Sequence, residues 1–470
     1  MGELEGDQRV TAVKRLTPEA SSIFSGPLLP VFIRYTLPSA VGLLAITTSS
    51  LVDGIFVGHF IGIDALAAVN LLIPVLTFFF ACVLTLAIGG SVRAGFLLGR
   101  GEKSAASKVL STCLIFALGI AGLFVFAGYW GADYLYRLLQ APADLQAVLR
   151  QYFPLLLVGL PLQFTAVMLY YFLRTCGYPG SASTGLVTGA ATNIILDALL
   201  VGGLNGGVAA AAMATVAAQA VQCGILVWHF YRKSPLQFRL RHWQPRQLVP
   251  VLTNGFSEFI NEMSAGVVIA TINLLVLLRL GVEGVAAFAV INYLQFAYLM
   301  LCYGFVDSQH VLVSHNRGAG NHRRAAAFLR VCITSISATG LLMISLLTIG
   351  RDRVLATFLP ESSPEQAQLF HTLLTQIWPV FLLSGVNIAC CAFLTASGRA
   401  GPSAVLSLLR SLILPVSLLL VFGQWLARED FLQALPLAEL MVLLTIIGLT
   451  LWSYRYSANP IEGLGARKGN

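Results

Sequence analysis

Long runs of apolar residues, separated by short polar or glycine-rich segments, dominate the chain. A helix needs about 20 mostly apolar residues to cross the hydrocarbon core of a bilayer. Windows of that length predict twelve membrane spans, near residues 28–58, 65–91, 107–129, 150–173, 180–201, 206–230, 249–279, 284–308, 326–349, 370–394, 403–424 and 433–455. The pattern therefore predicts an all-α polytopic membrane protein.

Composition agrees with this class and suggests where the chain divides. Hydrophobic residues make up 57% and charged residues 11% of the 470 residues, whereas soluble domains carry roughly 25% charged residues. Residues 1–26 lack an apolar core, so we expect a cytoplasmic tail and no cleavable signal peptide. We expect an N-lobe of six helices over 27–231, a basic linker over 232–247, a C-lobe of six helices over 248–456 and a cytoplasmic tail over 457–470.

Three short segments of the first half recur in the same order in the second half. Gly62–Ala68 resembles Gly281–Ala287, Gly99–Gly101 resembles Asn316–Gly320, and Phe172–Gly177 resembles Phe393–Gly398. Each half has an even number of spans, so the two lobes are predicted to be parallel repeats, related by a pseudo-two-fold axis along the membrane normal. Such repeats place a substrate path at their interface and suit alternating access.

Basic residues predict the orientation in the membrane, because Lys and Arg accumulate in cytoplasmic loops. If the N-terminus is inside, most Lys and Arg fall on the cytoplasmic side, in loops and at span ends, Arg174 among them. The opposite side holds only Arg137, Arg150, Arg279, Arg351, Arg353 and Arg428. We therefore expect both termini in the cytoplasm and a location in the cell (inner) membrane. The net charge of +8 then needs no nucleic-acid partner.

Two acidic residues lie inside the spans of the first half. An ionisable group there costs about 2.5–3.5 kcal/mol on insertion scales and is usually retained for function. Asp53 lies in span one; Asn193 and Asp197, four residues apart in span five, share one helix face. With Thr215 of span six they could form an oxygen-rich site for Na⁺, or a carboxylate pair that carries a proton. Alternatively, Asn193 and Thr215 only join helices by hydrogen bonds.

Proline and further acids mark other positions of interest. Pro38 lies fifteen residues before Asp53 in the same span and predicts a kink, unless it is simply tolerated near the helix end. In the second half, Glu262 is the candidate C-lobe acid, and Glu258 is expected at the interface. We expect Asp307 to be a rim charge paired with Arg317. Glu439 is expected to face water outside.

Enzymatic chemistry has little support in the sequence. The eight cysteines, expected to be free and buried, form no CxxC pair, and the seven histidines have no ligand spacing. We see no paired catalytic histidine and acid, no GxSxG and no nucleotide loop. We therefore expect no enzyme activity, no metal site apart from Na⁺ at the coupling residues, and no cofactor apart from H⁺ or Na⁺ as coupling ion.

Four motifs together resemble one transporter family. They are Val52–Gly58 (VDGIFVG), Asp64–Asn70 (DALAAVN), Asn193–Ala198 (NIILDA) and Asn316–Gly320 (NRGAG). With the twelve-span layout they make the chain similar to the multidrug and toxic compound extrusion (MATE) transporters, especially the bacterial DinF-like and MepA-like members. The resemblance implies an antiporter that exports organic, often cationic, compounds in exchange for inward H⁺ or Na⁺.

The resemblance also assigns roles to residues. It implies cation or proton coupling at Asp53, Asn193, Asp197 and Thr215, and helix bending at Pro38. Glu262 resembles the acid in span seven of other members, but span ten has no acid, so the chain departs from members with a C-lobe cation site built on one. We expect a monomer whose partners are small organic substrates and membrane lipids. The alternative is a flippase for a lipid or lipid-linked saccharide, for which the spans hold few basic residues.

Overall fold

The structure is a computed structural model that describes the backbone of residues 18–358, 363–426 and 430–456, and the side chains of 21–358, 363–426 and 430–450. The first half comprises α2 (Pro18–Ser25), α3 (Leu28–Phe56), α4 (Ile63–Gly99), α5 (Lys103–Leu138), α6 (Ala143–Thr175), α7 (Pro179–Leu196) and α8 (Gly207–Lys233). The second comprises α9 (Leu248–Gly318), α10 (His322–Phe358), α11 (Pro364–Ile377), α12 (Val380–Ala396), α13 (Ala400–Leu408), α14 (Leu414–Trp425) and α15 (Ala434–Tyr456). These ranges contain no strand, so the all-α prediction is confirmed.

Short irregular turns extend or connect several helices. Wide π-type turns follow α3 (η1, Val57–Ile61), α7 (η2, Asp197–Gly203) and α13 (η5, Leu409–Ile413). Narrow 3₁₀ turns form η3 (Leu240–His242) and η4 (Pro245–Gln247) in the predicted linker, and η6 (Asp430–Gln433) before α15. The π-type turns matter most here, because such turns occur often at functional sites.

The number of membrane crossings matches the twelve predicted spans. Eleven helical segments of the described chain are long and apolar enough to cross a bilayer, and the longest of them is Pro245–Gly318. This segment changes direction at Gly281, whose φ is +72°. Glycine adopts a positive φ at little cost because it has no Cβ, so α9 forms two crossings joined at Gly281.

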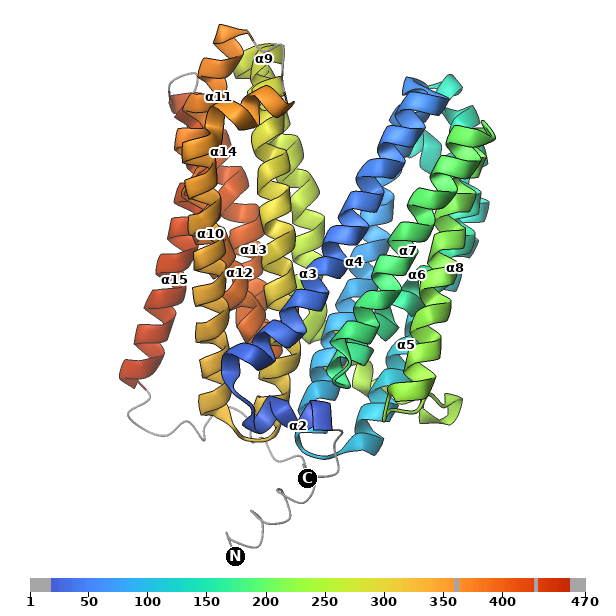
Figure 1. Cartoon of the computed structure of the whole chain (residues 1–470), viewed down its shortest axis with the longest axis vertical. Helices are drawn as coiled ribbons and strands as arrows, with labels where there is room; N and C mark the ends of the chain where they lie inside the picture. Colours follow the sequence, from blue (N-terminus) through green and yellow to red (C-terminus); the bar gives the residue numbers. More distant parts are fainter. Residues whose placement is uncertain (1–17, 359–362, 427–429, 457–470) are drawn as a thin grey trace, which may run out of the picture.

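Two separate hydrophobic cores divide the described chain into two lobes (Figure 1). The N-lobe core runs from Val57 at the start of η1 to Val251 at the start of α9. The C-lobe core is built from the rest of α9 and the later helices, and it also includes Phe32 and Tyr35 of α3. Helix α3 therefore begins in one lobe and ends in the other.

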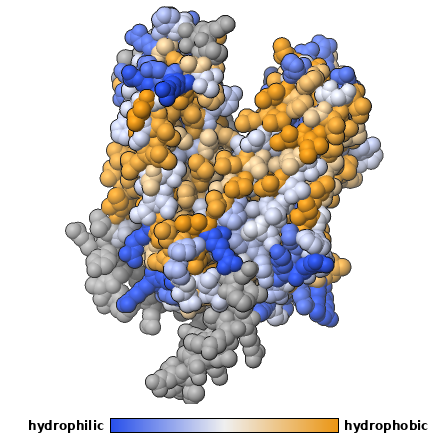
Figure 2. Space-filling view, viewed as in Figure 1, coloured by the Kyte–Doolittle hydropathy of each residue, from blue (hydrophilic) through white to orange (hydrophobic). Residues whose placement is uncertain are grey.

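The surface of both lobes suits a bilayer. Figure 2 shows hydrophobic residues over the middle of each lobe and hydrophilic residues towards the two ends. Large apolar side chains on this surface are exposed, for example Ile55 at 66% and Phe126 at 64%. Apolar side chains on the outside of a long helical bundle are stable in lipid, which agrees with a multi-pass membrane protein.

The lobes meet along a line of close contact between α4 and α9, which we call the seam. Added methyl groups at Gly89 or Gly99 of α4 would overlap backbone carbonyls of α9, and one at Gly255 of α9 would overlap the backbone of α4. The seam includes the end of the molecule that carries α2, and towards the opposite end the lobes diverge (Figure 1). Figure 2 shows a deep notch between them there.

Candidate functional site

The two acids of the N-lobe lie close together although 144 positions separate them in the sequence. Asp53 lies in the last turn of α3, just before η1, and Asp197 is the first residue of η2. Asp197 is fully buried, and the two carboxylates are near enough to interact electrostatically. The structure therefore brings together the acids of spans one and five.

Asn193 is attached to the same region by a hydrogen bond between helices. Ser49 of α3 donates to Oδ1 of Asn193 at 2.6 Å and also reaches the carbonyl of Ala190 at 3.3 Å. Ser49 lies one turn before Asp53, and Asn193 lies one turn before Asp197. This bond therefore fixes the two acid-bearing helices against each other.

Thr215 forms a hydrogen bond within its own helix. Its hydroxyl donates to the carbonyl of Ala211 at 3.1 Å, one turn earlier in α8. In the described chain no hydrogen bond joins it to Asp53, Asn193 or Asp197. A hydroxyl satisfied within its own helix still offers oxygen lone pairs, so its role in the site stays a prediction.

Tyr152 of α6 is a member of this region that the sequence did not suggest. It is 4% exposed, and both Asp53 and Asp197 act on it electrostatically. The sequence gives no clear signal for it, because Tyr152 directly follows the polar residues Arg150 and Gln151 at the start of span four. We name Asp53, Asn193, Asp197 and Tyr152 together the acid site.

The acid site has two carboxyl groups and few internal partners. Oδ1 of Asp53 and both carboxylate oxygens of Asp197 are buried and accept no hydrogen bond from the residues that the structure describes. No Lys, Arg or His in the same part of the chain forms an ion pair with either acid. Buried carboxylates need a compensating proton or cation. The carboxylate and amide oxygens of the site can bind either H⁺ or a hard cation such as Na⁺.

Pro38 lies where α3 passes from the C-lobe core to the N-lobe. Just before it, Thr36 shares a hydrogen bond of 2.8 Å with Ser308 of α9, and after it Ser49 bonds α7. Helix α3 continues from Leu28 to Phe56 with Pro38 inside it. A proline removes one backbone hydrogen bond, so α3 has its weakest point between its two attachments. The predicted bending role is not tested by this arrangement.

The C-lobe holds a second group of polar residues, beginning on α9. Glu258 accepts a hydrogen bond from Asn261 at 3.2 Å, and Asn261 accepts one from Ser411 at 2.8 Å. Glu262 is half-buried one turn further along, and it interacts electrostatically with Glu258. Glu258 is thus part of a hydrogen-bonded network.

The prediction for Glu439 was wrong, because this residue does not face outside water. Asn387 of α12 donates to its carboxylate at 2.6 Å, and Arg410 of η5 lies 3.6 Å from it as an ion pair. Only 13% of the Glu439 side chain is exposed. Arg410 therefore neutralises an acid of the C-lobe, whereas none of the described cations pairs with the acid site of the N-lobe.

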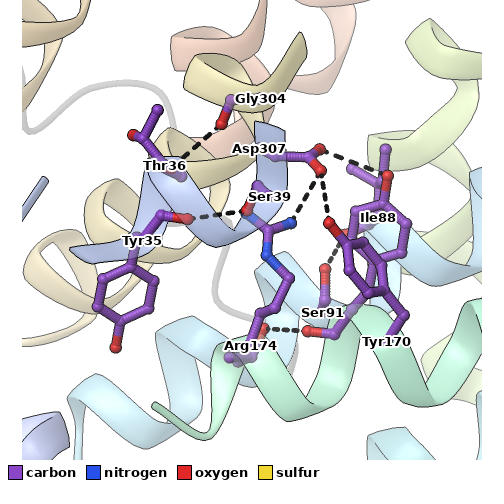
Figure 3. Close-up of polar contacts among 12 residues, drawn as sticks. Tyr35, Thr36, Ser39, Ile88, Ser91, Tyr170, Arg174, Gly304 and Asp307 are labelled. Carbon is purple, nitrogen blue, oxygen red and sulfur yellow. Dashed lines mark hydrogen bonds and ion pairs between the residues drawn. The ribbon is translucent and has the colours of Figure 1, made fainter. Parts of the chain in front are cut away.

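A buried ion pair joins the two lobes (Figure 3). The guanidinium of Arg174, from α6, lies 3.0 Å from the carboxylate of Asp307, from α9. The Arg174 side chain is 0% exposed and that of Asp307 is 7% exposed. The expectation of a rim charge paired with Arg317 was therefore wrong, and Arg174 is not on a loop. Helix α9 continues ten residues past the predicted end of the span, so Asp307 lies well inside the protein.

Two tyrosines complete the surroundings of this pair. Tyr170 and Tyr171 donate to the two oxygens of Asp307 at 3.3 and 3.4 Å. The guanidinium carbon of Arg174 lies 5.1 and 5.8 Å from the centres of the same rings, a cation–π geometry. We name Tyr170, Tyr171, Arg174 and Asp307 the ion-pair cluster. Serines of α3 and α4 lie around it in Figure 3, so four membrane helices meet there.

Cysteine and metal predictions can also be compared with the structure. All eight cysteines are free, six of them buried and two half-buried, so the prediction of free thiols is confirmed. In the described part of the chain, no group of three or more His, Cys, Asp and Glu side chains could hold a metal ion.

Comparison with known proteins identifies the family. The sequence profile of the MatE family matches residues 38–199 and again residues 260–421. The two matches fall in the two lobes with nearly the same spacing as the repeated segments, so the internal repeat is confirmed.

Individual proteins agree with this match. The chain is 22% identical over 433 residues to the multidrug export protein MepA of Staphylococcus saprophyticus, covering 90% of this chain and 92% of that protein. It is 26% identical over 394 residues to the probable multidrug resistance protein YoeA of Bacillus subtilis, covering 80% and 81%. A solved structure, an outward-facing multidrug resistance MATE family transporter, superposes with a TM-score of 0.85 at 21% identity over 94% of this chain and 99% of that one.

The two profile matches together cover well over half of the sequence, and the superposition supports the same fold for nearly all of it. The resemblance to MATE transporters inferred from four short motifs is therefore confirmed. The chain belongs to the MatE family.

Proposed function

We propose that this protein is a secondary antiporter that exports organic, often cationic, compounds in exchange for inward H⁺ or Na⁺. The relatives named for multidrug export support the class of substrate. The acid site supports the coupling to a cation. The cargo is moved without chemical conversion, so the proposal includes no enzyme activity.

One observation carries the coupling proposal. Two carboxylates, half-buried Asp53 and buried Asp197, lie near enough in the N-lobe to interact and have no ion-pair partner in the described chain. Removing a carboxylate from water disfavours its charged form, and a second negative charge nearby adds to that cost. Binding one proton or one Na⁺ offsets this cost, so the site is suited to take up a cation and to release it again.

The arrangement of the lobes supports alternating access. The bias of Lys and Arg supports a cytoplasmic location for the end that carries α2, and with that orientation the notch between the lobes would open to the outside. Coupling requires that cation and substrate differ in affinity between this state and its opposite. Helix α3 reaches both lobes and carries Asp53, so the state of the acid site can act on the contact between them through this helix.

Transport by everted membrane vesicles tests the proposal. A proton gradient and a sodium gradient are imposed separately, and movement of a cationic dye is followed by fluorescence. In Asp53→Asn the neutral amide imitates a carboxylate that keeps its proton. We expect at least a tenfold loss of gradient-driven transport, with unchanged amounts of folded protein in the membrane.

A matched control separates this effect from a general loss of negative charge. Asp144, in the first turn of α6, is exposed, and Asp144→Asn should transport like the unmodified protein. Wild-type transport by Asp53→Asn under both gradients would refute the coupling role of the acid site. Transport that survives an ionophore but requires ATP would refute the antiporter class.

A flippase for a lipid or lipid-linked saccharide is the second candidate and is not favoured. The cavity of such a protein needs several unpaired basic residues to bind a pyrophosphate. Here Arg174 pairs with Asp307 and Arg410 pairs with Glu439. Both of these arginines therefore already have an acidic partner.

A further inference from the structure

A pocket lies beside the seam, near the end of the molecule that carries α2. It has a volume of about 560 Å³, within the range of roughly 300–1,000 Å³ typical of small-molecule sites. One wall is α4 of the N-lobe. The others are the first turns of α9 and the turn between α12 and α13, from Ser397 to Ala400. The pocket is therefore formed by both lobes together.

The wall from α4 carries two arginines. Arg93 and Arg100 are seven residues apart, two helical turns, and so they lie on the same face of the helix. Phe96 and Leu97 lie between them in the same wall. The Nε of Arg93 donates to Gln247 at 2.8 Å, and in the described chain neither guanidinium forms an ion pair with a carboxylate. Two charged guanidiniums beside an apolar surface favour an anion with an apolar part.

Two buried polar atoms make this more than a basic surface. Asn254 is 8% exposed and Ser397 is 7% exposed, and both line the pocket. The side-chain carbonyl oxygen of Asn254 and the hydroxyl of Ser397 have no hydrogen-bond partner among the described residues. Buried polar atoms usually have partners, and an unpartnered one calls for a bound group or solvent. Here they offer one acceptor and one hydroxyl to whatever fills the pocket.

We propose that this pocket binds the headgroup of an anionic phospholipid whose phosphate is esterified to a hydroxyl-bearing alcohol, as in phosphatidylglycerol. Guanidinium groups match the geometry of phosphate oxygens, so Arg93 and Arg100 would hold the phosphodiester. The headgroup hydroxyls would meet Asn254 and Ser397. The exposed side chain of Val249, 68% accessible, borders the pocket and would contact an acyl chain.

A lipid bound in this pocket would contact both lobes. Its phosphate would contact α4 of one lobe, while Ser397 belongs to the other lobe. A ligand that needs both walls binds only while the lobes are joined at this end, and it stabilises that state by its affinity difference. This stabilisation by the lipid depends on neither the substrate nor the direction of transport.

The test uses the purified full-length protein in detergent, titrated with short-chain phosphatidylglycerol, with short-chain phosphatidylcholine and with inorganic phosphate. Bound lipid is counted by native mass spectrometry, and thermal stability is measured in parallel. We expect saturable binding and a higher melting temperature with phosphatidylglycerol, and much weaker effects with the other two. Removing both charges, in Arg93→Gln with Arg100→Gln, should weaken binding about thirtyfold.

Two further variants separate the effect of the pocket from a general loss of positive charge. Arg239→Gln with Arg241→Gln removes two exposed charges of the linker and should bind lipid normally. Thr253→Phe fills the pocket without changing charge and should lose binding. The proposal would be overturned if the linker double variant lost as much lipid binding as Arg93→Gln with Arg100→Gln. Normal lipid binding by Thr253→Phe would also overturn it. An equal response to inorganic phosphate alone would overturn the assignment to a lipid.

Discussion

The ion-pair cluster allows a quantitative prediction about the balance between two states of the transporter. Replacing Asp307 by Asn removes one charge of a buried pair and leaves the Arg174 guanidinium without its counter-ion. Removing one partner of a buried pair costs about 3–5 kcal/mol, because the remaining charge stays away from water. The cost arises where the lobes are joined, since Arg174 and Asp307 come from different lobes.

This cost should change the population of states. If the lobes part at this end, Arg174 can regain water and the penalty disappears. At the lower end of the range, about 3 kcal/mol, the ratio of joined to parted molecules falls roughly a hundredfold. A protein that rests mainly in the joined state would then populate the parted state to a measurable extent.

Distances between spin labels can measure the shift. Leu204, after η2 in the N-lobe, and Val282, next to Gly281 in the C-lobe, are 74% and 77% exposed at the diverging ends of the two lobes. Cysteines at these positions can be labelled after the half-buried Cys82 and Cys390 are changed to Ala. In Asp307→Asn we expect a new population with a shorter distance between the two labels, because the diverging ends of the lobes approach each other.

A matched control uses an ion pair of the same length on the surface. Asp133 lies 3.0 Å from Arg150, with both side chains more than 60% exposed, and exposed pairs contribute roughly 0–1 kcal/mol. Asp133→Asn should leave the distance distribution unchanged. Replacing both partners of the buried pair, in Arg174→Met with Asp307→Leu, should restore most of the joined state. Identical distributions for Asp307→Asn and Asp133→Asn would refute the reasoning.

Two other sites give predictions with internal controls. Gly255→Val should shorten the same label distance and lower the melting temperature, because a side chain there overlaps the α4 backbone; Gly266→Val, with open space around it, should do neither. Ser49→Ala removes a bond to Asn193 that contributes about 1 kcal/mol, so we expect roughly fivefold weaker apparent affinity for the coupling cation in the vesicle assay. Ser50→Ala, which loses only a bond within α3, should behave normally. Each prediction would be contradicted if the test variant and its own control had equal effects.

Much of the fold can be predicted from the sequence, because lipid-facing helices must be apolar over a fixed length. The twelve spans and the internal repeat follow from that constraint and from segments such as Gly62–Ala68. The approach of Asp53 to Asp197 could also be anticipated, because few ionisable residues occur in the first half, and isolated charges in apolar spans tend to share a site.

The partners of Asp307 and Glu439 could not be predicted in the same way. Hydropathy windows detect where a helix faces lipid, whereas both residues lie on parts of helices buried against other protein. There polar groups are stable when they pair across helices. Arg174 pairs with a residue 133 positions away, and no local pattern encodes which helices become neighbours. The place of Tyr152 in the acid site could not be predicted for the same reason.

The glycines of the seam have a consequence for how the lobes separate. Where backbone meets backbone, as at Gly89, no long side chains interdigitate and no rotamers need to rearrange before the surfaces part. Dispersion attraction between such surfaces falls by roughly a quarter to a half over a gap of about 0.5–1 Å. A partly opened seam would therefore lose much of the attraction while water still could not enter. The two lobes should thus exchange between joined and parted forms as rigid bodies in an all-or-none step, with no stable half-open form between them.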